Sequence, residues 1–161
     1  MLLQQVFAPG RIKIGLASGD KDELFEELVD ILASEGGGTF PRAAALSAVR
    51  EREDKMSTGI KKGIALPHGK AEGISELCGA IGISARGIDY GSLDGEPVYL
   101  VFMLVSPPAD SESHLAALKR LAILLDDPEF YTDLLRADSP ARANSILGNY
   151  ETRLMELNPG R

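Results

Sequence analysis

The sequence is poor in cysteine and in aromatic residues: it has one cysteine and no tryptophan, and aromatics make up 6% of its 161 residues. The single cysteine, Cys78, excludes an internal disulfide framework and a thiolate metal cluster within one chain, and it fits a reducing compartment. So few aromatic side chains argue against a surface on which nucleic-acid bases stack. No apolar run reaches the roughly 18–20 residues that cross a bilayer, and residues 1–7 lack the regions of a signal peptide. We therefore expect a cytoplasmic protein that neither inserts into a membrane nor binds nucleic acid.

Acidic side chains outnumber basic ones by 24 to 17, which gives a net charge of −7 and a pI near 4.9. This charge disfavours nonspecific binding to nucleic acid or to an anionic membrane. With 44% hydrophobic and 25% charged residues, the composition is that of a globular protein. A chain of this length can bury a sizeable core as one domain. We expect a single domain over 1–161, with residues 1–10 as a loose lead-in.

Hydrophobic periodicity predicts strands and helices along the chain. Strands are expected over 11–16, 77–85 and 97–105, and the last is apolar on both faces, as a central strand covered on two sides would be. The order of elements favours helices on both faces of a mixed sheet. Helices are expected from Asp20 to the glycines 36–38, from Thr39 and Pro41 to Lys55, over 111–126, and after the capping residues Asp127 and Ser139. In the helix over 111–126, the apolar face is expected to carry Leu115, Leu118, Ala122 and Leu125.

His68 is one of two histidines in the chain. It follows a short apolar strand candidate, 64–66, and Pro67, which cannot donate a hydrogen bond to a sheet and should end the strand. His68 would then be presented at a strand end, where side chains commonly line binding crevices, and Gly69 would allow close backbone approach. A histidine that is hydrogen-bonded and inert in a turn explains the local sequence equally well.

His114 falls in the expected first turn of the helix over 111–126. A helix start offers unpaired N–H groups and a partial positive charge, which suit an anion. Taken alone, however, this pattern favours a surface or capping histidine. Arg50 and Arg52 end another helix, where cations are favourable whatever the function.

Other kinds of chemistry find little support in the sequence. The two histidines lie 46 positions apart without a zinc-ligand spacing, so no metal site is expected. Ser/His/Asp hydrolysis would need a G-x-S-x-G turn, and residues 59–63 lack the Gly-Lys-Ser/Thr ending of a phosphate-binding loop. Cys78, within an apolar strand, is expected to be a core residue.

Residues 58–69 contain Thr58-Gly59-Ile60 and Gly63-Ile64-Ala65-Leu66-Pro67-His68-Gly69. This stretch resembles the phosphorylation-site signature of the EIIA domains of the bacterial phosphotransferase system, of the fructose/mannitol type and its nitrogen-regulatory relative. Leu66 stands where the family more often has Ile or Val, and the glycines 36–38 and the lead-in differ from the family. The resemblance runs over roughly 11–150 and includes Asp20-Lys21-Asp22-Glu23, Arg50-Glu51-Arg52-Glu53, 87–98, and Ser111-Glu112-Ser113-His114-Leu115.

The resemblance implies a three-layer α/β/α sandwich with a mixed sheet, the mannitol-type EIIA fold shared with anion-transport proteins. It also implies a phosphotransferase in which His68 is the phosphoacceptor, His114 is its neighbour in the site and Arg52 holds the phosphate. Positioning and charge stabilise phosphoryl transfer, so no cofactor or metal is required. Additional phosphate contacts are expected from Ser57, Thr58 and backbone N–H groups near Gly63 or the 111–114 turn.

The partners that the family implies leave two main interpretations open. HPr, or its nitrogen-branch equivalent, is the expected phosphoryl donor in both. A sugar-specific EIIA would pass the group to an EIIB permease domain, whereas a nitrogen-regulatory EIIA would act by binding target proteins. The expectation of a free-standing domain favours the regulatory interpretation. A third possibility, a domain that keeps the fold without phosphorylation, is disfavoured because both histidines and Arg52 are retained.

Overall fold

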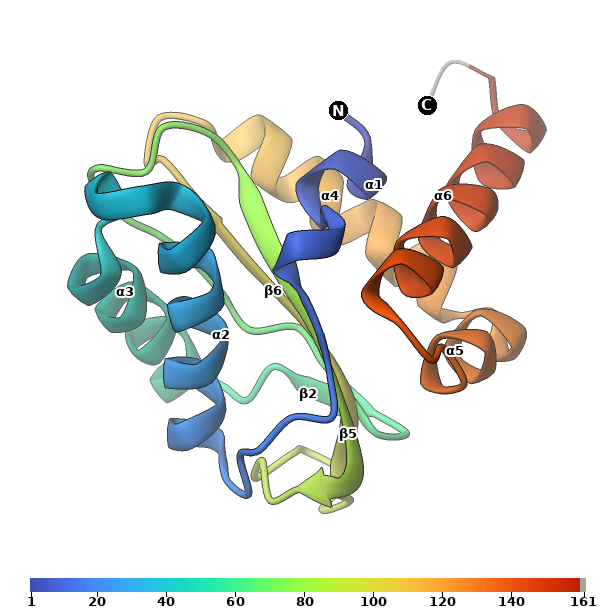
Figure 1. Cartoon of the computed structure of the whole chain (residues 1–161), viewed down its shortest axis with the longest axis horizontal. Helices are drawn as coiled ribbons and strands as arrows, with labels where there is room; N and C mark the ends of the chain where they lie inside the picture. Colours follow the sequence, from blue (N-terminus) through green and yellow to red (C-terminus); the bar gives the residue numbers. More distant parts are fainter. Residues whose placement is uncertain (160–161) are drawn as a thin grey trace.

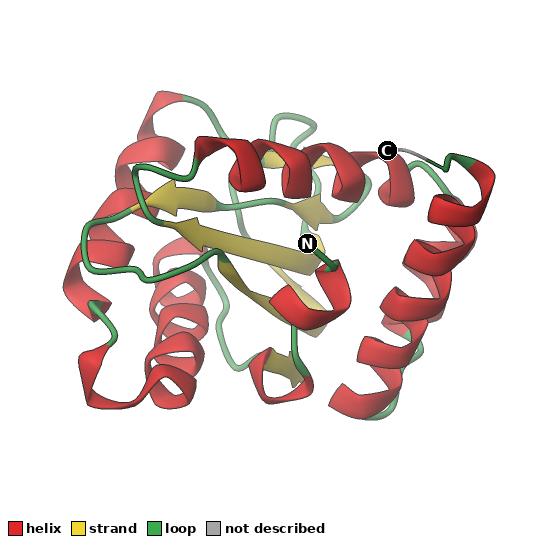
Figure 2. Cartoon of the chain, turned by 90° about the horizontal axis from the view of Figure 1, so that it is seen from above, coloured by secondary structure: helices red, strands yellow, loops and turns green. Residues whose placement is uncertain are grey.

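The computed structural model describes residues 1–159 and arranges them in three layers, with a β-sheet between two groups of helices (Figures 1 and 2). Helices α2 (Lys21–Gly36) and α3 (Arg42–Lys55) cover one face of the sheet. The other face is covered by α1 (Leu3–Val6), α4 (Ser111–Leu125), α5 (Pro128–Leu135) and α6 (Pro140–Leu157). The short 3-10 turns are η1 (Pro9–Arg11) and η2 (Gly37–Thr39). The predicted three-layer sandwich is therefore confirmed.

No helix among the described residues is long and apolar enough to cross a membrane.

The sheet is mixed, as the sequence predicted. Its order is β1-β5-β6-β3-β2, and β4 pairs with β6 beyond the end of β3. Neighbouring strands are parallel in the pairs β1–β5, β3–β6 and β4–β6, and antiparallel in β5–β6 and β2–β3. The strands are β1 (Ile12–Ile14), β2 (Gly59–Lys61), β3 (Ile64–Ala65), β4 (His68–Lys70), β5 (Cys78–Ile88) and β6 (Val98–Ser106).

Strand β6 is the central strand that its apolar run predicts. Successive side chains of a strand point to opposite faces, so an apolar run fills both layers of the core. Phe102 and Leu104 lie in the cluster beneath α4, α5 and α6, while Val101 and Met103 lie in the cluster beneath α2 and α3. All four side chains are fully buried.

Strand β3 ends at Ala65, just before Pro67, as the sequence predicted, but a further strand that the sequence did not predict begins at His68. The chain remains extended past Pro67 and continues along β6 as β4, with His68 opposite Leu104. A proline lacks the N–H donor, but its carbonyl still accepts a hydrogen bond. Here the Pro67 carbonyl accepts from the Leu104 N–H at 3.0 Å. His68 is the first residue of β4, so it lies at a strand end, as predicted, and not in a turn.

Strand β2, which the sequence did not predict, forms a two-residue hairpin with β3. Both turn residues have positive φ, 50° at Lys62 and 84° at Gly63. Two consecutive positive values are typical of the type I′ turn, whose twist matches that of paired strands. The β2–β3 hairpin thus places β2 at one edge of the sheet.

The helix starts predicted from the capping residues Asp20, Asp127 and Ser139 are confirmed. Asp20, Asp127 and Ser139 each accept a hydrogen bond from a backbone N–H in the first turn of α2, α5 and α6. The predicted start of α3 at Thr39 and Pro41 is wrong: Thr39 belongs to η2, Pro41 precedes the helix, and α3 begins at Arg42. The predicted face of α4 is right at Leu125, which is buried, but wrong at Leu115 and Ala122, which are exposed. The buried face turns one position back, to His114, Ala117, Leu121, Leu124 and Leu125.

The loose lead-in expected for residues 1–10 is also wrong. Leu3 and Phe7 are fully buried. The backbone N–H groups of Leu3 and Gln4 donate to the buried carboxylate of Glu151 on α6, at 2.7 and 3.2 Å. Figure 1 shows α1 beside α6, although the two helices lie at opposite ends of the chain. Periodicity could not reveal this contact, because α1 is a single turn whose partners are 147 or more positions away.

Replacing Phe7 tests the packing of this segment. The Phe7 ring meets the Phe102 ring edge-on, with centroids 5.4 Å apart. We expect Phe7→Ala to lower the free energy of unfolding by roughly 3–5 kcal/mol, measured by urea denaturation, because the vacated space is fully buried. Leu2→Ala, at a 37% exposed position, should change it by at most about 0.5 kcal/mol. Equal effects of the two substitutions would contradict the packing.

Candidate active site

His68 lies half-buried at the start of β4, and the backbone holds its ring in one orientation. The Nδ1 atom is 2.7 Å from the carbonyl oxygen of Leu66. A carbonyl can only accept a hydrogen bond, so Nδ1 carries the proton of the neutral ring. The lone pair is therefore on Nε2, which makes this atom the nucleophilic nitrogen.

Gly69 brings helix α3 close to the strand that carries His68. A Cβ atom at this position would lie 2.8 Å from the carbonyl carbon of Ala48 and 2.9 Å from the nitrogen of Val49. Only a glycine lets the backbones of β4 and α3 approach so closely. This contact carries the C-terminal turn of α3, with Arg52, toward His68.

His114 faces His68 from the other side of the site. The two rings meet edge to face, with centroids 5.3 Å apart and an angle of 62° between their planes. His114 is only 5% exposed, and its Nδ1 lies 2.6 Å from Oγ of Ser106. The local interpretation as a surface or capping residue is thus wrong, since Asp110 caps α4 by accepting from the Ser113 N–H. Helix phase explains the difference: His114 belongs to the buried face of α4.

Burial and nearby cations keep both imidazoles neutral. Burial lowers the pKa of His68, and the charges of Arg52 and Lys70 act in the same direction, while the bond to Leu66 and the charge of Glu53 oppose them. The pKa of His114 falls to about 4, mainly through burial and also through His68 and Lys70. At neutral pH the site therefore contains two uncharged rings beneath a positive rim.

Arg52 and Lys70 supply that positive rim. The Arg52 guanidinium donates to the carbonyl of Met56 at 2.9 Å, across the end of α3. The Lys70 ammonium donates to Oγ of Ser111 at 2.8 Å, at the first residue of α4. Sequence reasoning missed Lys70. Its signal was the two-residue period of a strand, which puts it on the same face as His68.

The turn between α3 and β2 is held by a buried carboxylate. Glu53 is 5% exposed and accepts from the N–H and the hydroxyl of Thr58, at 3.0 and 2.5 Å. The Tyr90 hydroxyl donates to the same carboxylate at 3.1 Å and lies 2.7 Å from the Thr58 hydroxyl. The Thr58 hydroxyl therefore points into the protein and not toward a phosphate. Ser57 is half-buried, and its Oγ accepts from the Gly59 N–H at 3.1 Å.

Gly63 does not lie beside His68, contrary to the sequence prediction. It occupies the β2–β3 turn, where an added Cβ would touch Tyr131 and Tyr99. The five extended residues from Gly63 to His68 span roughly 16 Å. Gly63 therefore forms the turn of the hairpin, and its N–H lies too far from His68 to bind a phosphoryl group there.

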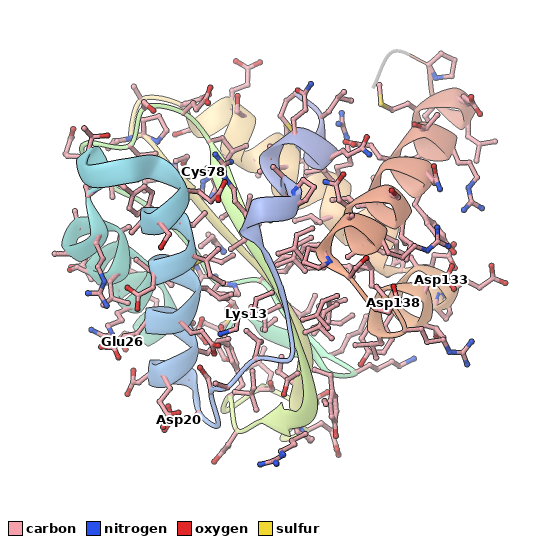
Figure 3. All side chains as sticks on the ribbon, in the orientation of Figure 1. Lys13, Asp20, Glu26, Cys78, Asp133 and Asp138 are labelled. Atoms are coloured by element: carbon pink, nitrogen blue, oxygen red, sulfur yellow. The ribbon has the colours of Figure 1, made fainter. Side chains whose placement is uncertain are left out.

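Cys78 is a core residue, as the sequence predicted. It lies on β5 in the cluster beneath α2 and α3, where Figure 3 labels it. Burial raises the pKa of its thiol to about 11. The thiolate needed for nucleophilic attack is therefore scarce at neutral pH.

Comparison with known proteins places this geometry in one family. Residues 5–150 match the model of the family described as "Phosphoenolpyruvate-dependent sugar phosphotransferase system, EIIA 2". The fructose-specific EIIABC component of Bacillus subtilis is 35% identical over 94% of this chain, which spans only 24% of that relative. The nitrogen regulatory protein of Pseudomonas aeruginosa is 33% identical over 88% of this chain and 90% of its own length. The crystal structure of nitrogen regulatory protein IIA-Ntr from Neisseria meningitidis aligns with a TM-score of 0.83 and 28% identity, over 90% of this chain and 98% of that one.

The buried histidines predict that acid destabilises the protein. Unfolded histidines titrate near pH 6.5, whereas folded His114 titrates at about 4. Below pH 6.5 the unfolded chain therefore binds more protons, and stability is lost as the pH falls toward 4. Denaturant titrations should show the free energy of unfolding falling by roughly 2 kcal/mol between pH 7.5 and pH 5.

His114→Gln provides the control, because glutamine can bond Ser106 but does not titrate. We expect the variant to lose most of the pH dependence. An equal fall in the variant and the wild type would show that His114 does not cause it.

Proposed function

The chain belongs to the EIIA 2 family of the phosphoenolpyruvate-dependent sugar phosphotransferase system, and we propose that it is a phosphohistidine carrier in which His68 accepts the phosphoryl group on Nε2. The observation that carries the proposal is the bond from Nδ1 of His68 to the Leu66 carbonyl, 2.7 Å long. It commits one ring nitrogen to the backbone and leaves the other as a nucleophile. A lowered pKa keeps that nitrogen unprotonated at neutral pH.

HPr, or its nitrogen-branch equivalent, is the proposed donor. The Nε2 lone pair of His68 forms a bond to phosphorus as the bond between phosphorus and the donor atom breaks, and the electron pair of that bond leaves with the donor. The reverse sequence of events passes the group to the next acceptor. Because the phosphoryl group keeps its oxygens throughout, the protein contributes position and charge, and no cofactor is needed.

The residues around His68 supply that position and charge. Arg52 offers a planar fork that can bind two phosphoryl oxygens, and Lys70 adds a second cation at the start of α4. The α4 N-terminus contributes further partial positive charge. His114 supplies a neutral hydrogen-bond donor, and Ser57 lies in the turn that follows Arg52. Thr58 takes a supporting role, because its hydroxyl holds the turn through Glu53.

We infer that the protein is a nitrogen-regulatory EIIA that acts on protein partners. Its likeness to a nitrogen regulatory protein spans 90% of that relative, and its likeness to IIA-Ntr spans 98% of that structure. The alternative is a sugar-specific EIIA that passes the phosphoryl group to a fructose- or mannitol-type EIIB domain. The match to the fructose-specific EIIABC component supports this alternative.

Substitution of each histidine tests the carrier chemistry. The proteins are incubated with phosphoenolpyruvate, Enzyme I and HPr or its nitrogen-branch equivalent, and intact masses are recorded. We expect the wild type to gain one phosphoryl group and the folded His68→Ala variant to gain none. His114→Ala should accept the group but pass it on more slowly, on the order of 100-fold, because a hydrogen-bond donor to the phosphoryl group is lost.

Uptake of phosphate by His68→Ala would contradict the site assignment. The phosphorylated wild type is then mixed with an isolated EIIB domain that carries its acceptor cysteine. Transfer to the cysteine would support the sugar-transport alternative. A stable phosphorylated form that binds or releases a protein target would support the regulatory role.

Arg50 and Arg52 form a matched pair on α3. Arg50 is partly exposed and pairs with Asp22 and Glu26 of α2 at 3.9 and 3.5 Å, whereas the charge of Arg52 reaches His68. We expect Arg52→Ala to slow phosphoryl uptake by on the order of 100-fold in a rapid-quench assay, because it removes a cation from the transition state. Arg50→Ala should leave the rate unchanged. Equal rates for the two variants would exclude the role of Arg52.

A further inference from the structure

The two histidines are held through the same ring atom by partners of different character. Nδ1 of His68 meets the Leu66 carbonyl, and Nδ1 of His114 meets the Ser106 hydroxyl. The carbonyl can only accept a hydrogen bond, whereas a hydroxyl can accept or donate one. The tautomer of His114 therefore depends on the direction of the bond to Ser106.

Burial decides that direction. Ser106 is fully buried, and within the described residues 1–159 its hydroxyl has no hydrogen-bond partner other than His114. If His114 donated to Oγ, the hydroxyl hydrogen would be left in the core without an acceptor, at a cost of about 1–3 kcal/mol. If the hydroxyl donates to Nδ1, its hydrogen has an acceptor and the ring proton lies on Nε2.

We propose that Ser106 is a positioning residue that donates its hydroxyl hydrogen to Nδ1 of His114 and so holds His114 as the Nε2–H tautomer. This inference rests on the proposed phosphoryl carrier function, because it assigns a role within the same site. The Ser106 hydroxyl makes no bond to phosphorus and keeps its proton throughout. It acts through His114 alone.

The proposal gives the two rings complementary tautomers. His68 presents a lone pair on Nε2, and His114 presents an N–H on its own Nε2, with ring centroids 5.3 Å apart. One ring attacks phosphorus while the other donates a hydrogen bond to a phosphoryl oxygen. A pKa of about 4 keeps His114 neutral, so the donor is a ring N–H and not an imidazolium.

The backbone of Ser106 is well placed for this role. As the last residue of β6, it pairs with Lys70 of β4, and its carbonyl accepts from the Ala71 N–H at 3.0 Å. The same two strands pair His68 with Leu104. The atoms that orient both rings are thus fixed by one stretch of sheet.

Nitrogen-15 NMR of the histidine rings measures the tautomers directly, without any phosphoryl transfer. The chain has two histidines, so the spectrum of His68→Ala assigns both. In the wild type at neutral pH, we expect His114 to carry its proton on Nε2 and His68 on Nδ1. A proton on Nδ1 of His114 would overturn the proposal.

Variants of Ser106 then connect the tautomer to function. Ser106→Ala should shift His114 away from the pure Nε2–H form and slow phosphoryl transfer by about 10-fold. Ser106→Thr keeps the hydroxyl and should restore both properties. Ser84→Ala is the matched control, because Ser84 is 4% exposed on β5 and its Oγ accepts from the Gly87 N–H. This control should leave the His114 spectrum and the rate unchanged.

The outcomes separate this inference from the carrier function. A Ser106→Ala protein with an unaltered His114 tautomer would overturn the role of Ser106 even if the wild type accepts phosphate. A wild type that accepts no phosphate would contradict the carrier function, while its spectrum would still show whether Ser106 sets the tautomer.

Discussion

The site depends on the parallel pairing of β4 with β6. This short ladder places His68 opposite Leu104 and Lys70 opposite Ser106. Pro67 lies between β3 and β4, and its missing donor is tolerated because β6 needs only the Pro67 carbonyl at that point. Helix α3 packs on one face of this pair of strands, through the close contact at Gly69. Helix α4 packs on the other face and places His114 against His68. One stretch of sheet therefore sets the positions of both histidines and of the cations around them.

The charges around His68 suit a phosphoryl group that must be bound and then released. The protein is acidic overall, with a net charge of −7, but the site combines neutral rings with Arg52 and Lys70. A buried, fully charged pocket would hold a phosphoryl group tightly. A half-exposed nucleophile with cations at its edge can stabilise the transition state and still release the group. The added negative charge also changes the surface locally, which is what a regulatory partner would recognise.

Features that depend on neighbours in sequence were predictable, and features that depend on distant contacts were not. The caps at Asp20, Asp127 and Ser139 are local hydrogen bonds and were found from the residue type. The docking of residues 3–7 depends on Glu151, which lies far along the chain. Strand β4 was missed because its three residues form a strand only by pairing with β6, which lies more than 30 residues further along the chain. Gly63 shows the limit of motif reasoning: it belongs to the stretch that resembles the family signature, yet it shapes a hairpin away from His68.

The central claim is that the backbone selects the reacting nitrogen of His68, because the Leu66 carbonyl occupies Nδ1. The most direct test is phosphorus–nitrogen NMR of the phosphorylated protein, prepared with nitrogen-15 in its histidine rings. The account predicts that phosphorus couples to Nε2 of His68, with Nδ1 still protonated and bonded to Leu66. Coupling to Nδ1 of His68, or to either nitrogen of His114, would contradict it.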